Sequence, residues 1–274
     1  MNDNIINHPE KLIQLFGQHF VALFLEIDRP PHKRGQFRNF FGFSGILISV
    51  DGVTFYMTAG HILRDILEGL QDQTISILGA KLGDVFGASR ITDYPIPFNL
   101  DPAEIFFIID DKLGLDFGLI ALTSYYLKLL AANNVTSLFR ENWEKQHQVR
   151  YDAFIMMGLP QEHTGENLAP TGSLQVSPTL LVLEPIGKTV AGIPKDTKGR
   201  FHARISSELP FESIVGMSGG PIFGINFDDP MRYWIVAIQS SWLESAKEVF
   251  GCPIQNVGEM IQEELRKARQ RREG

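Results

Sequence analysis

The chain has 274 residues, of which 44% are hydrophobic and 21% charged, and its formal net charge is −7 at pH 7. This length suits one large all-β domain or two small ones, and the acidic balance argues against a nucleic-acid-binding surface across the whole protein. Cys252 is the sole cysteine, which excludes an internal disulfide and a thiolate cluster for a structural zinc.

The N-terminus has no basic segment that leads into a long apolar run, so no export signal is expected. The longest apolar stretches, at residues 20–27 and 105–109, are far shorter than the roughly 20 residues that a membrane-spanning helix needs. We therefore expect no membrane span.

The first half of the chain is predicted to consist of short strands with two helices. Residues 9–16 and 62–70 carry apolar residues at helical spacing. The dipeptide Asp51-Gly52 favours a tight hairpin, because both positions tolerate positive φ. Apolar runs bounded by turn residues predict strands at 21–27, 43–49, 53–58, 74–78, 105–109 and 118–122.

The second half is predicted to contain a further set of strands and a terminal helix. Residues 125–143 read as a helical or irregular connection, and an apolar stripe at helical spacing over 254–265 predicts a helix that docks on the preceding strands. Its basic end, 266–272, suits the C-terminus of a helix. Strands are predicted at 151–157, 174–183, 201–206, 221–225 and 233–240.

The segment Gly216-Met217-Ser218-Gly219-Gly220-Pro221 indicates a chemical role. A serine between glycines places a hydroxyl on a tight turn whose N–H groups can converge, which suits a nucleophile beside an oxyanion site. Because a free serine hydroxyl is a weak nucleophile, this interpretation requires a base and a group that orients the base. His61 and Asp116 are candidates, and the order His, Asp, Ser is one of three known for such triads.

Each assignment has a structural alternative. A lone histidine is more often structural than catalytic, but the ordered pattern favours His61 over the other six histidines. Asp116 could cap a turn, and Asp110 and Asp111 are nearby competitors; the apolar run that directly follows Asp116 favours it. Ser218 could serve only a glycine-rich turn.

Three ordered segments resemble the trypsin/chymotrypsin-like serine protease superfamily, and most closely its HtrA/Deg-type branch. They are residues 44–52 followed by Thr58-Ala59-Gly60-His61, then 116–122, and finally 216–221. The resemblance covers roughly residues 38–260.

The resemblance implies an all-β fold of two six-stranded-type antiparallel β-barrels, chymotrypsin-like, with a C-terminal helix. It divides the chain into five consecutive parts. These are an N-terminal helix, strand and loop at 1–37, a first barrel at 38–124, a connection at 125–148, a second barrel at 149–252, and the helix with its basic tail at 253–274.

The implied activity is that of a serine endopeptidase, which hydrolyses peptide bonds through an acyl-enzyme and needs neither a cofactor nor a metal. Ser218 would be the nucleophile, His61 the base, and Asp116 the group that orients it. The N–H groups of Gly216 and Ser218 would form the oxyanion hole.

Substrate-binding residues are also implied. Glu212 stands where the family places the floor of its primary specificity pocket, although a solvated acidic loop residue explains it equally well. The run Gln239-Ser240-Ser241-Trp242 resembles the edge strand that pairs with substrate in relatives, and Ser240 and Ser241 are its implied substrate-binding residues.

Two departures from the family concern regulation. Met217 replaces the acidic residue that pairs with a freed N-terminus in digestive relatives, so cleavage activation is not expected. The peptide-binding module usual in the HtrA/Deg type is not expected here, so control is expected to come from loops or from a regulatory protein partner.

The expected partners are therefore a protein or peptide substrate and such a regulator, but neither a membrane nor nucleic acid. Since secreted relatives rely on disulfides, a cytoplasmic location is expected. The alternative function is a catalytically silent protease-fold module that binds polypeptide segments or a partner protein.

Overall fold

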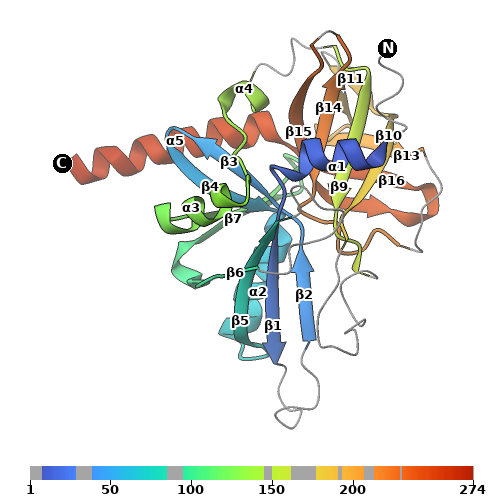
Figure 1. Cartoon of the computed structure of the whole chain (residues 1–274). Helices are drawn as coiled ribbons and strands as arrows, with labels where there is room; N and C mark the ends of the chain where they lie inside the picture. Colours follow the sequence, from blue (N-terminus) through green and yellow to red (C-terminus); the bar gives the residue numbers. More distant parts are fainter. Residues whose placement is uncertain are drawn as a thin grey trace.

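The computed structural model describes residues 8–28, 39–84, 95–144, 150–161, 177–190, 193–206, 213–228 and 230–273. Most of them lie in antiparallel strands that form two β-rich lobes, and a long C-terminal helix extends beside the first lobe (Figure 1). The expected all-β class with a terminal helix is confirmed. None of the helices in these ranges combines the length and the apolarity that crossing a bilayer requires.

The first lobe contains two four-stranded antiparallel sheets. The first sheet has the order β2-β1-β5-β6 and comprises β1 (Val21–Asp28), β2 (Asn39–Phe43), β5 (Ser76–Asp84) and β6 (Ile96–Pro97). The second has the order β3-β4-β8-β7 and comprises β3 (Ile46–Val50), β4 (Val53–Thr58), β7 (Ile105–Asp110) and β8 (Leu115–Ala121). Both contribute to one core, in which Leu23 of β1 lies with Leu47 and Ile120 of the second sheet.

The second lobe is a closed barrel of six strands. The order β10-β9-β14-β15-β16-β13 is closed by pairing between β10 and β13, and β12 and β11 extend the sheet beyond β13. The strands are β9 (Ala153–Gly158), β10 (Thr179–Pro185), β11 (Lys188–Val190), β12 (Ile193–Lys195), β13 (Phe201–Ile205), β14 (Pro221–Asn226), β15 (Arg232–Leu243) and β16 (Glu248–Pro253).

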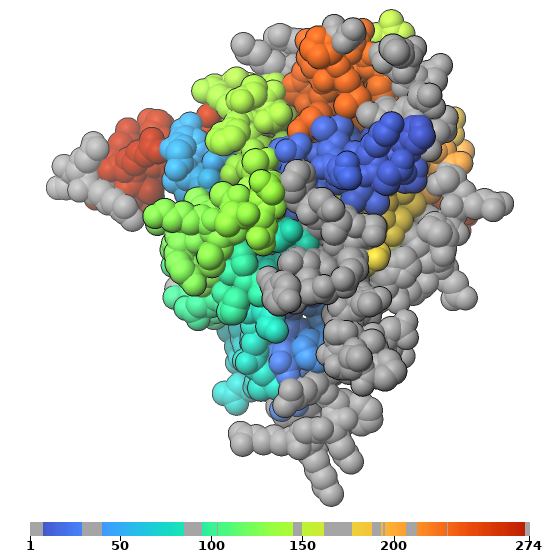
Figure 2. All heavy atoms as spheres, in the orientation of Figure 1, coloured from blue at the N-terminus to red at the C-terminus, as the bar shows by residue number. Residues whose placement is uncertain are grey.

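The helices cover and connect the lobes. They are α1 (Pro9–Gly17), α2 (Gly60–Gln71), α3 (Ser124–Ala132), α4 (Arg140–Trp143), α5 (Ile254–Glu273) and the 3₁₀ turns η1 (Pro102–Glu104) and η4 (Glu244–Ala246). Figure 2 shows α1, in blue, against the orange strands of the second lobe. There the Phe16 ring stacks on Phe223 with 4.4 Å between centroids. Helix α1 thereby contributes its buried face to the core that joins the two lobes.

Several local predictions hold, and two strand boundaries are corrected. Asp51 and Gly52 have φ values of +48° and +82°, which fits the predicted hairpin turn. The strand predicted at 43–49 is interrupted, because β2 ends at Phe43 and β3 begins at Ile46. Asp116 lies inside β8, where it pairs with Ile109, and not before the strand.

Strand β1 falls in the part predicted at 1–37 and belongs to a sheet of the first lobe. Strand β1 pairs with β2 on one side and β5 on the other, so this strand is an integral part of the lobe. The first residues of the strand predicted at 174–183 lie outside the described ranges.

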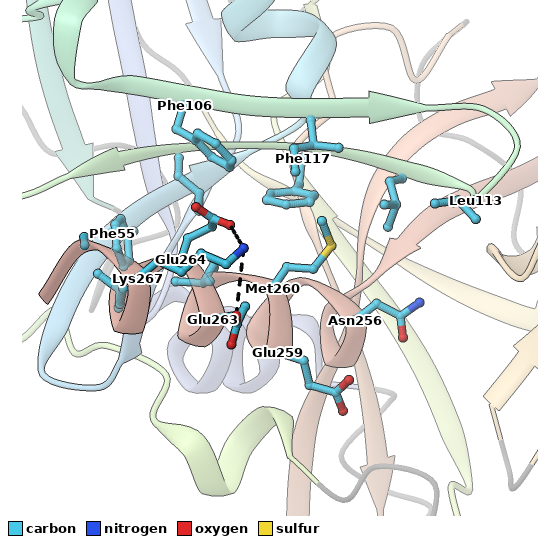
Figure 3. A pocket seen from close by; sticks show the side chains of 16 residues that line it. Phe55, Phe106, Leu113, Phe117, Asn256, Glu259, Met260, Glu263, Glu264 and Lys267 are labelled. Atoms are coloured by element: carbon cyan, nitrogen blue, oxygen red, sulfur yellow. Dashed lines mark hydrogen bonds and ion pairs between the residues drawn. The ribbon is translucent and has the colours of Figure 1, made fainter. Parts of the chain in front are cut away.

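A groove of about 1010 Å³ runs between α5 and the outer face of the β7–β8 hairpin (Figure 3). Its floor is apolar and includes Phe106 and Phe117, and its helix side includes Met260. Lys267 forms ion pairs with Glu263 and Glu264 at the edge. Leu115, Phe117 and Leu119 of β8 line the groove. Because successive side chains of a strand point to opposite faces, Asp116 projects away from the groove.

Candidate active site

The side chains of His61 and Asp116 meet at the start of helix α2. Asp116 Oδ2 accepts a hydrogen bond from His61 Nδ1 at 2.7 Å, and Oδ1 accepts one from the His61 main-chain N–H at 2.9 Å. The two side chains are 29% and 18% exposed, so the pair is shielded but reachable from solvent. The structure therefore brings together two of the three predicted catalytic residues.

The carboxylate determines which imidazole nitrogen carries the proton. An ionised carboxylate can only accept hydrogen bonds, so Nδ1 of His61 is the protonated nitrogen of the neutral ring. Nε2 then keeps its lone pair and can accept a proton. This tautomer is the one that a general base beside a serine requires.

Glycine at position 60 allows the close approach of α2 to β8. A Cβ on Gly60 would lie 2.9 Å from the carbonyl oxygens of Ile108 and Phe117 and 3.0 Å from Asp116 Oδ1. Any larger residue would push the start of the helix away from the carboxylate. The main-chain N–H of His61 is one of the first donors of the helix, which have no partner within the helix, and Asp116 satisfies it.

The turn that carries Ser218 lies against the strand that leads to His61. Gly219 has φ +84°, and a Cβ there would overlap Thr58 Oγ1 and the Ser44 carbonyl oxygen and lie 3.0 Å from the Ala59 nitrogen. The residue after Ser218 is thus packed on the two residues that precede Gly60 and His61. No hydrogen bond joins the Ser218 hydroxyl to the His61 ring in this structure, although both residues are described; such bonds are often long before substrate binds.

The main-chain N–H of Gly216 is oriented by its neighbour. The Val215 carbonyl accepts a hydrogen bond from the Gln161 N–H at 2.7 Å. In a trans peptide the N–H points opposite to the carbonyl of the same unit, so the Gly216 N–H points away from Gln161. It donates to no main-chain carbonyl among the described residues.

The N–H of Ser218 has a similar environment. The Met217 carbonyl accepts from the Gly220 N–H at 2.9 Å, which directs the Ser218 N–H away from Gly220. Within the described part of the chain this N–H also has no main-chain acceptor. The turn therefore carries two main-chain donors, at Gly216 and Ser218, whose directions are set by the hydrogen bonds of the preceding carbonyls.

Strand β15 holds the turn and then continues as a one-sided edge. The Gln239 carbonyl accepts from Gly219 N–H, and its N–H donates to Gly220, both at 2.9 Å. Pairing of β15 with β14 begins at Ile238, whereas pairing with β16 continues to Leu243.

The predicted substrate-binding residues Ser240 and Ser241 lie in this edge segment. Among the described strands, residues 240–243 have a partner on one side only. Ser240 is largely buried, with its hydroxyl 3.3 Å from the Phe250 carbonyl, and Ser241 is exposed. Glu212 lies outside the described residues.

The sequence places Ser44 and Thr58 within the resembling segments and Gln239 in the substrate-pairing strand, but it predicts no role for them at the Ser218 turn. Ser44, Thr58 and Gln239 are all buried, and each contacts the Ser218 turn or the residues around it. Polar residues inside or beside apolar strands are the signal that could have identified them, because buried polar groups are nearly always hydrogen-bonded.

Cys252 lies behind the candidate site without exposing its sulfur. It is fully buried and contacts the Asp116 main chain, and burial raises the pKa of its thiol to about 12. The thiol is therefore protonated and unreactive at neutral pH. In the described ranges no group of three or more His, Cys, Asp or Glu side chains is placed to bind a metal ion.

Comparisons with known proteins give weak structural matches only. No protein-family profile matches the chain, and no curated protein is significantly similar in sequence. One similar structure is the protease Anisep from Arthrobacter nicotinovorans, with 15% identity, a TM-score of 0.45, and coverage of 86% of this chain and 90% of that one.

Two further matches are of the same kind. The thermostable serine protease AL20 from an extremophilic microorganism has 15% identity, a TM-score of 0.46 and coverage of 86% and 91%. The inactivated protease paralogue S-I1 of the scabies mite has 15% identity, a TM-score of 0.47 and coverage of 93% and 96%. At these values the matches assign no activity to this chain.

Proposed function

We propose that this protein is a serine endopeptidase that hydrolyses peptide bonds through His61, Asp116 and Ser218. The observation that carries the proposal is the 2.7 Å hydrogen bond from His61 Nδ1 to Asp116 Oδ2, which leaves Nε2 free to accept a proton. The packing of Gly219 on Thr58 and Ala59 supports the presence of Ser218 at the same place.

In the proposed first step, Ser218 Oγ attacks the carbonyl carbon of the scissile peptide while His61 Nε2 takes the hydroxyl proton. Asp116 stabilises the imidazolium that results. The carbonyl oxygen becomes negative and receives hydrogen bonds from the N–H groups of Gly216 and Ser218. The C–N bond then breaks, His61 returns the proton to the leaving amine, and an ester of Ser218 remains.

The second step regenerates the protein. A water molecule gives its proton to His61 Nε2 and attacks the ester carbonyl, and the same two N–H groups stabilise the second oxyanion. Ser218 leaves with the proton from His61, and a carboxylic acid is released.

The one-sided edge of β15 supports a peptide substrate. Residues 240–242, which pair on one side only among the described strands, follow directly on Gln239, which holds the Ser218 turn. A substrate that adds there as a strand would present its backbone to the turn through main-chain hydrogen bonds. Ser240 and Ser241 are accordingly proposed as substrate-binding residues.

Labelling with a fluorophosphonate probe tests this function. We expect the wild-type protein to become labelled at Ser218, Ser218→Ala to remain unlabelled, and the exposed control Ser245→Ala to label like the wild type. Hydrolysis of a casein or peptide-library substrate is expected to follow the same pattern. A wild-type protein that neither labels nor cleaves, yet binds peptides, would instead support the silent binding module.

A further inference from the structure

Ser44 is a fully buried residue of the first lobe that contacts the second lobe. It lies between β2 and β3 and is 0% exposed. A buried hydroxyl needs hydrogen-bond partners, because leaving it without any costs free energy. The partners of the Ser44 hydroxyl therefore indicate what this residue holds in place.

Both partners of the hydroxyl belong to the main chain around the Ser218 turn. The Leu159 N–H donates to Ser44 Oγ at 2.9 Å, and Ser44 Oγ donates to the Gly216 carbonyl at 3.4 Å. The Ser44 hydroxyl thus both donates and accepts a hydrogen bond, and both partners belong to the second lobe.

Leu159 and Gly216 are themselves in contact. Gly216 has φ +94°, and a Cβ there would lie 2.9 Å from the Leu159 carbonyl oxygen and 2.7 Å from the Gln161 nitrogen. Gln161 is the residue whose N–H orients the Val215–Gly216 peptide. The Ser44 hydroxyl therefore joins the two segments whose relative position sets the direction of the Gly216 N–H.

The main chain of Ser44 connects this junction to the His61 strand. Its carbonyl accepts a hydrogen bond from Thr58 Oγ1 at 2.7 Å, and Thr58 lies three residues before His61. The same carbonyl and the Thr58 hydroxyl form the surface against which Gly219 packs. Ser44 is thus tied at once to the strand that delivers the candidate base and to the turn that carries the candidate nucleophile.

We infer that Ser44 is a positioning residue that holds the Gly216 N–H of the proposed oxyanion hole in its donating direction. The inference rests on the proposed function. Removing the hydroxyl leaves the Leu159 N–H and the Gly216 carbonyl without this partner and allows the turn to rotate. Because the Gly216 N–H would act on the oxyanion that forms during the reaction, its loss is expected to slow the chemical step more than it weakens substrate binding.

Steady-state kinetics of Ser44→Ala with a peptide or ester substrate test the inference. We expect kcat to fall by about 10- to 100-fold while KM stays within about twofold of the wild type. Affinity for a peptide boronic acid, which forms a tetrahedral adduct with a nucleophilic serine, is expected to fall in parallel with kcat/KM. If Ser44 affected only the stability of the fold, Ser44→Ala would not lower kcat while leaving KM unchanged.

Ser49→Ala is the matched control. Ser49 is in β3, which begins two residues after Ser44, and its hydroxyl is 2.7 Å from Thr54 Oγ1, near the β3–β4 hairpin turn. This variant loses a comparable hydrogen bond and is expected to keep the wild-type kcat. If Ser44→Ala does not fold, Ser44→Cys, which preserves the size and a weak donor, replaces it and is expected to show the same loss of kcat with KM retained.

The possible failures are distinguishable. If the wild type shows Ser218-dependent turnover and Ser44→Ala keeps the wild-type kcat, or loses activity only as much as Ser49→Ala, the positioning role is wrong and the proposed function stands. If the wild type shows no Ser218-dependent turnover or labelling, the proposed function is wrong and the positioning role falls with it.

Discussion

At the scale of single residues, Asp116 has a role that its amide analogue cannot fill. Its two carboxylate oxygens accept the Nδ1–H and the main-chain N–H of His61. Asparagine has only one side-chain acceptor, and its NH₂ group would face an N–H donor. To avoid this repulsion the ring must adopt the other tautomer, in which Nε2 carries the proton and is no longer a base.

We therefore expect Asp116→Asn to lower kcat by about 10⁴-fold with little change in KM, measured on the substrate that reveals Ser218-dependent cleavage. Asp110→Asn is the control, since within the described ranges Asp110 accepts from the main-chain N–H groups of Lys112 and Leu113 in the neighbouring hairpin turn. Full activity of Asp116→Asn, or a larger loss in Asp110→Asn, would contradict the proposed orienting role.

At the scale of elements, the contact between the Ser218 turn and β4 depends on the small size of one glycine. Gly219 adopts φ +84° and packs against Thr58, Ser44 and Ala59. A side chain there has to displace atoms of the first lobe as well as accept a left-handed backbone conformation. The turn and the strand would then separate.

We expect Gly219→Ala to lower the free energy of unfolding by about 2–4 kcal/mol and to abolish labelling of Ser218. Gly199→Ala is a matched control, because Gly199 has a nearly equal φ of +80° and no atom within 4 Å of a built Cβ. We expect Gly199→Ala to lower the free energy of unfolding by about 1–2 kcal/mol, through backbone strain alone. Urea denaturation of both variants measures the difference, and equal losses would show that the packing on Thr58 is unimportant.

The elements that could be predicted are those whose signals are local. The Asp51-Gly52 turn, the helices α1, α2 and α5, and strands such as β4 and β7 follow from turn chemistry or from apolar spacing. The break between β2 and β3 was not predicted, and at this point Gly45 packs closely on the Tyr56 ring, a contact that the local sequence does not indicate. Strand β16, with Gly251, Cys252 and Pro253, has little intrinsic strand preference and is defined by its neighbours β13 and β15.

The candidate site was predictable to a similar degree. Its three chemically distinctive residues stand in recognisable segments, so sequence order alone identified His61, Asp116 and Ser218 as candidates. The supporting residues Ser44, Thr58 and Gln239 stand in or beside such segments too, but nothing local in the sequence indicates which residues they contact. Their partners lie about 14 to 172 positions away along the chain, and only the folded backbone brings these together.

At the scale of the whole molecule, one buried histidine links three distant segments. His19 follows α1, and its Nδ1–H donates to the Thr136 carbonyl, between α3 and α4, at 2.8 Å. Its Nε2 accepts from the Tyr233 hydroxyl of β15 at 2.7 Å. Acceptance by Nε2 requires the neutral ring, and burial lowers the pKa of His19 from 6.5 to about 4.

This depressed pKa predicts a loss of stability in acid. Below pH 6.5 the unfolded chain binds a proton at His19 that the folded protein rejects until the pH approaches 4. The stabilisation is therefore complete above pH 6.5 and is lost as the pH falls through this window, by about 3 kcal/mol in total. Denaturant unfolding at a series of pH values should show it.

His19→Gln provides the comparison. The difference between wild type and variant at pH 8 reports the two hydrogen bonds, and the change in that difference between pH 6.5 and 4 reports the titration of His19. We expect the two stability curves to converge as the solution is acidified. Curves that run parallel over this range would mean that His19 does not titrate with a depressed pKa.

The candidate site takes its residues from both lobes, and this has a consequence for synthesis of the chain. A nascent polypeptide contains His61 and Asp116 about a hundred residues before Ser218 has been translated. Neither lobe by itself possesses the full set of reactive groups, so an incomplete product released from the ribosome carries no assembled site. Any proteolytic activity of this protein therefore requires that both lobes have folded and packed together.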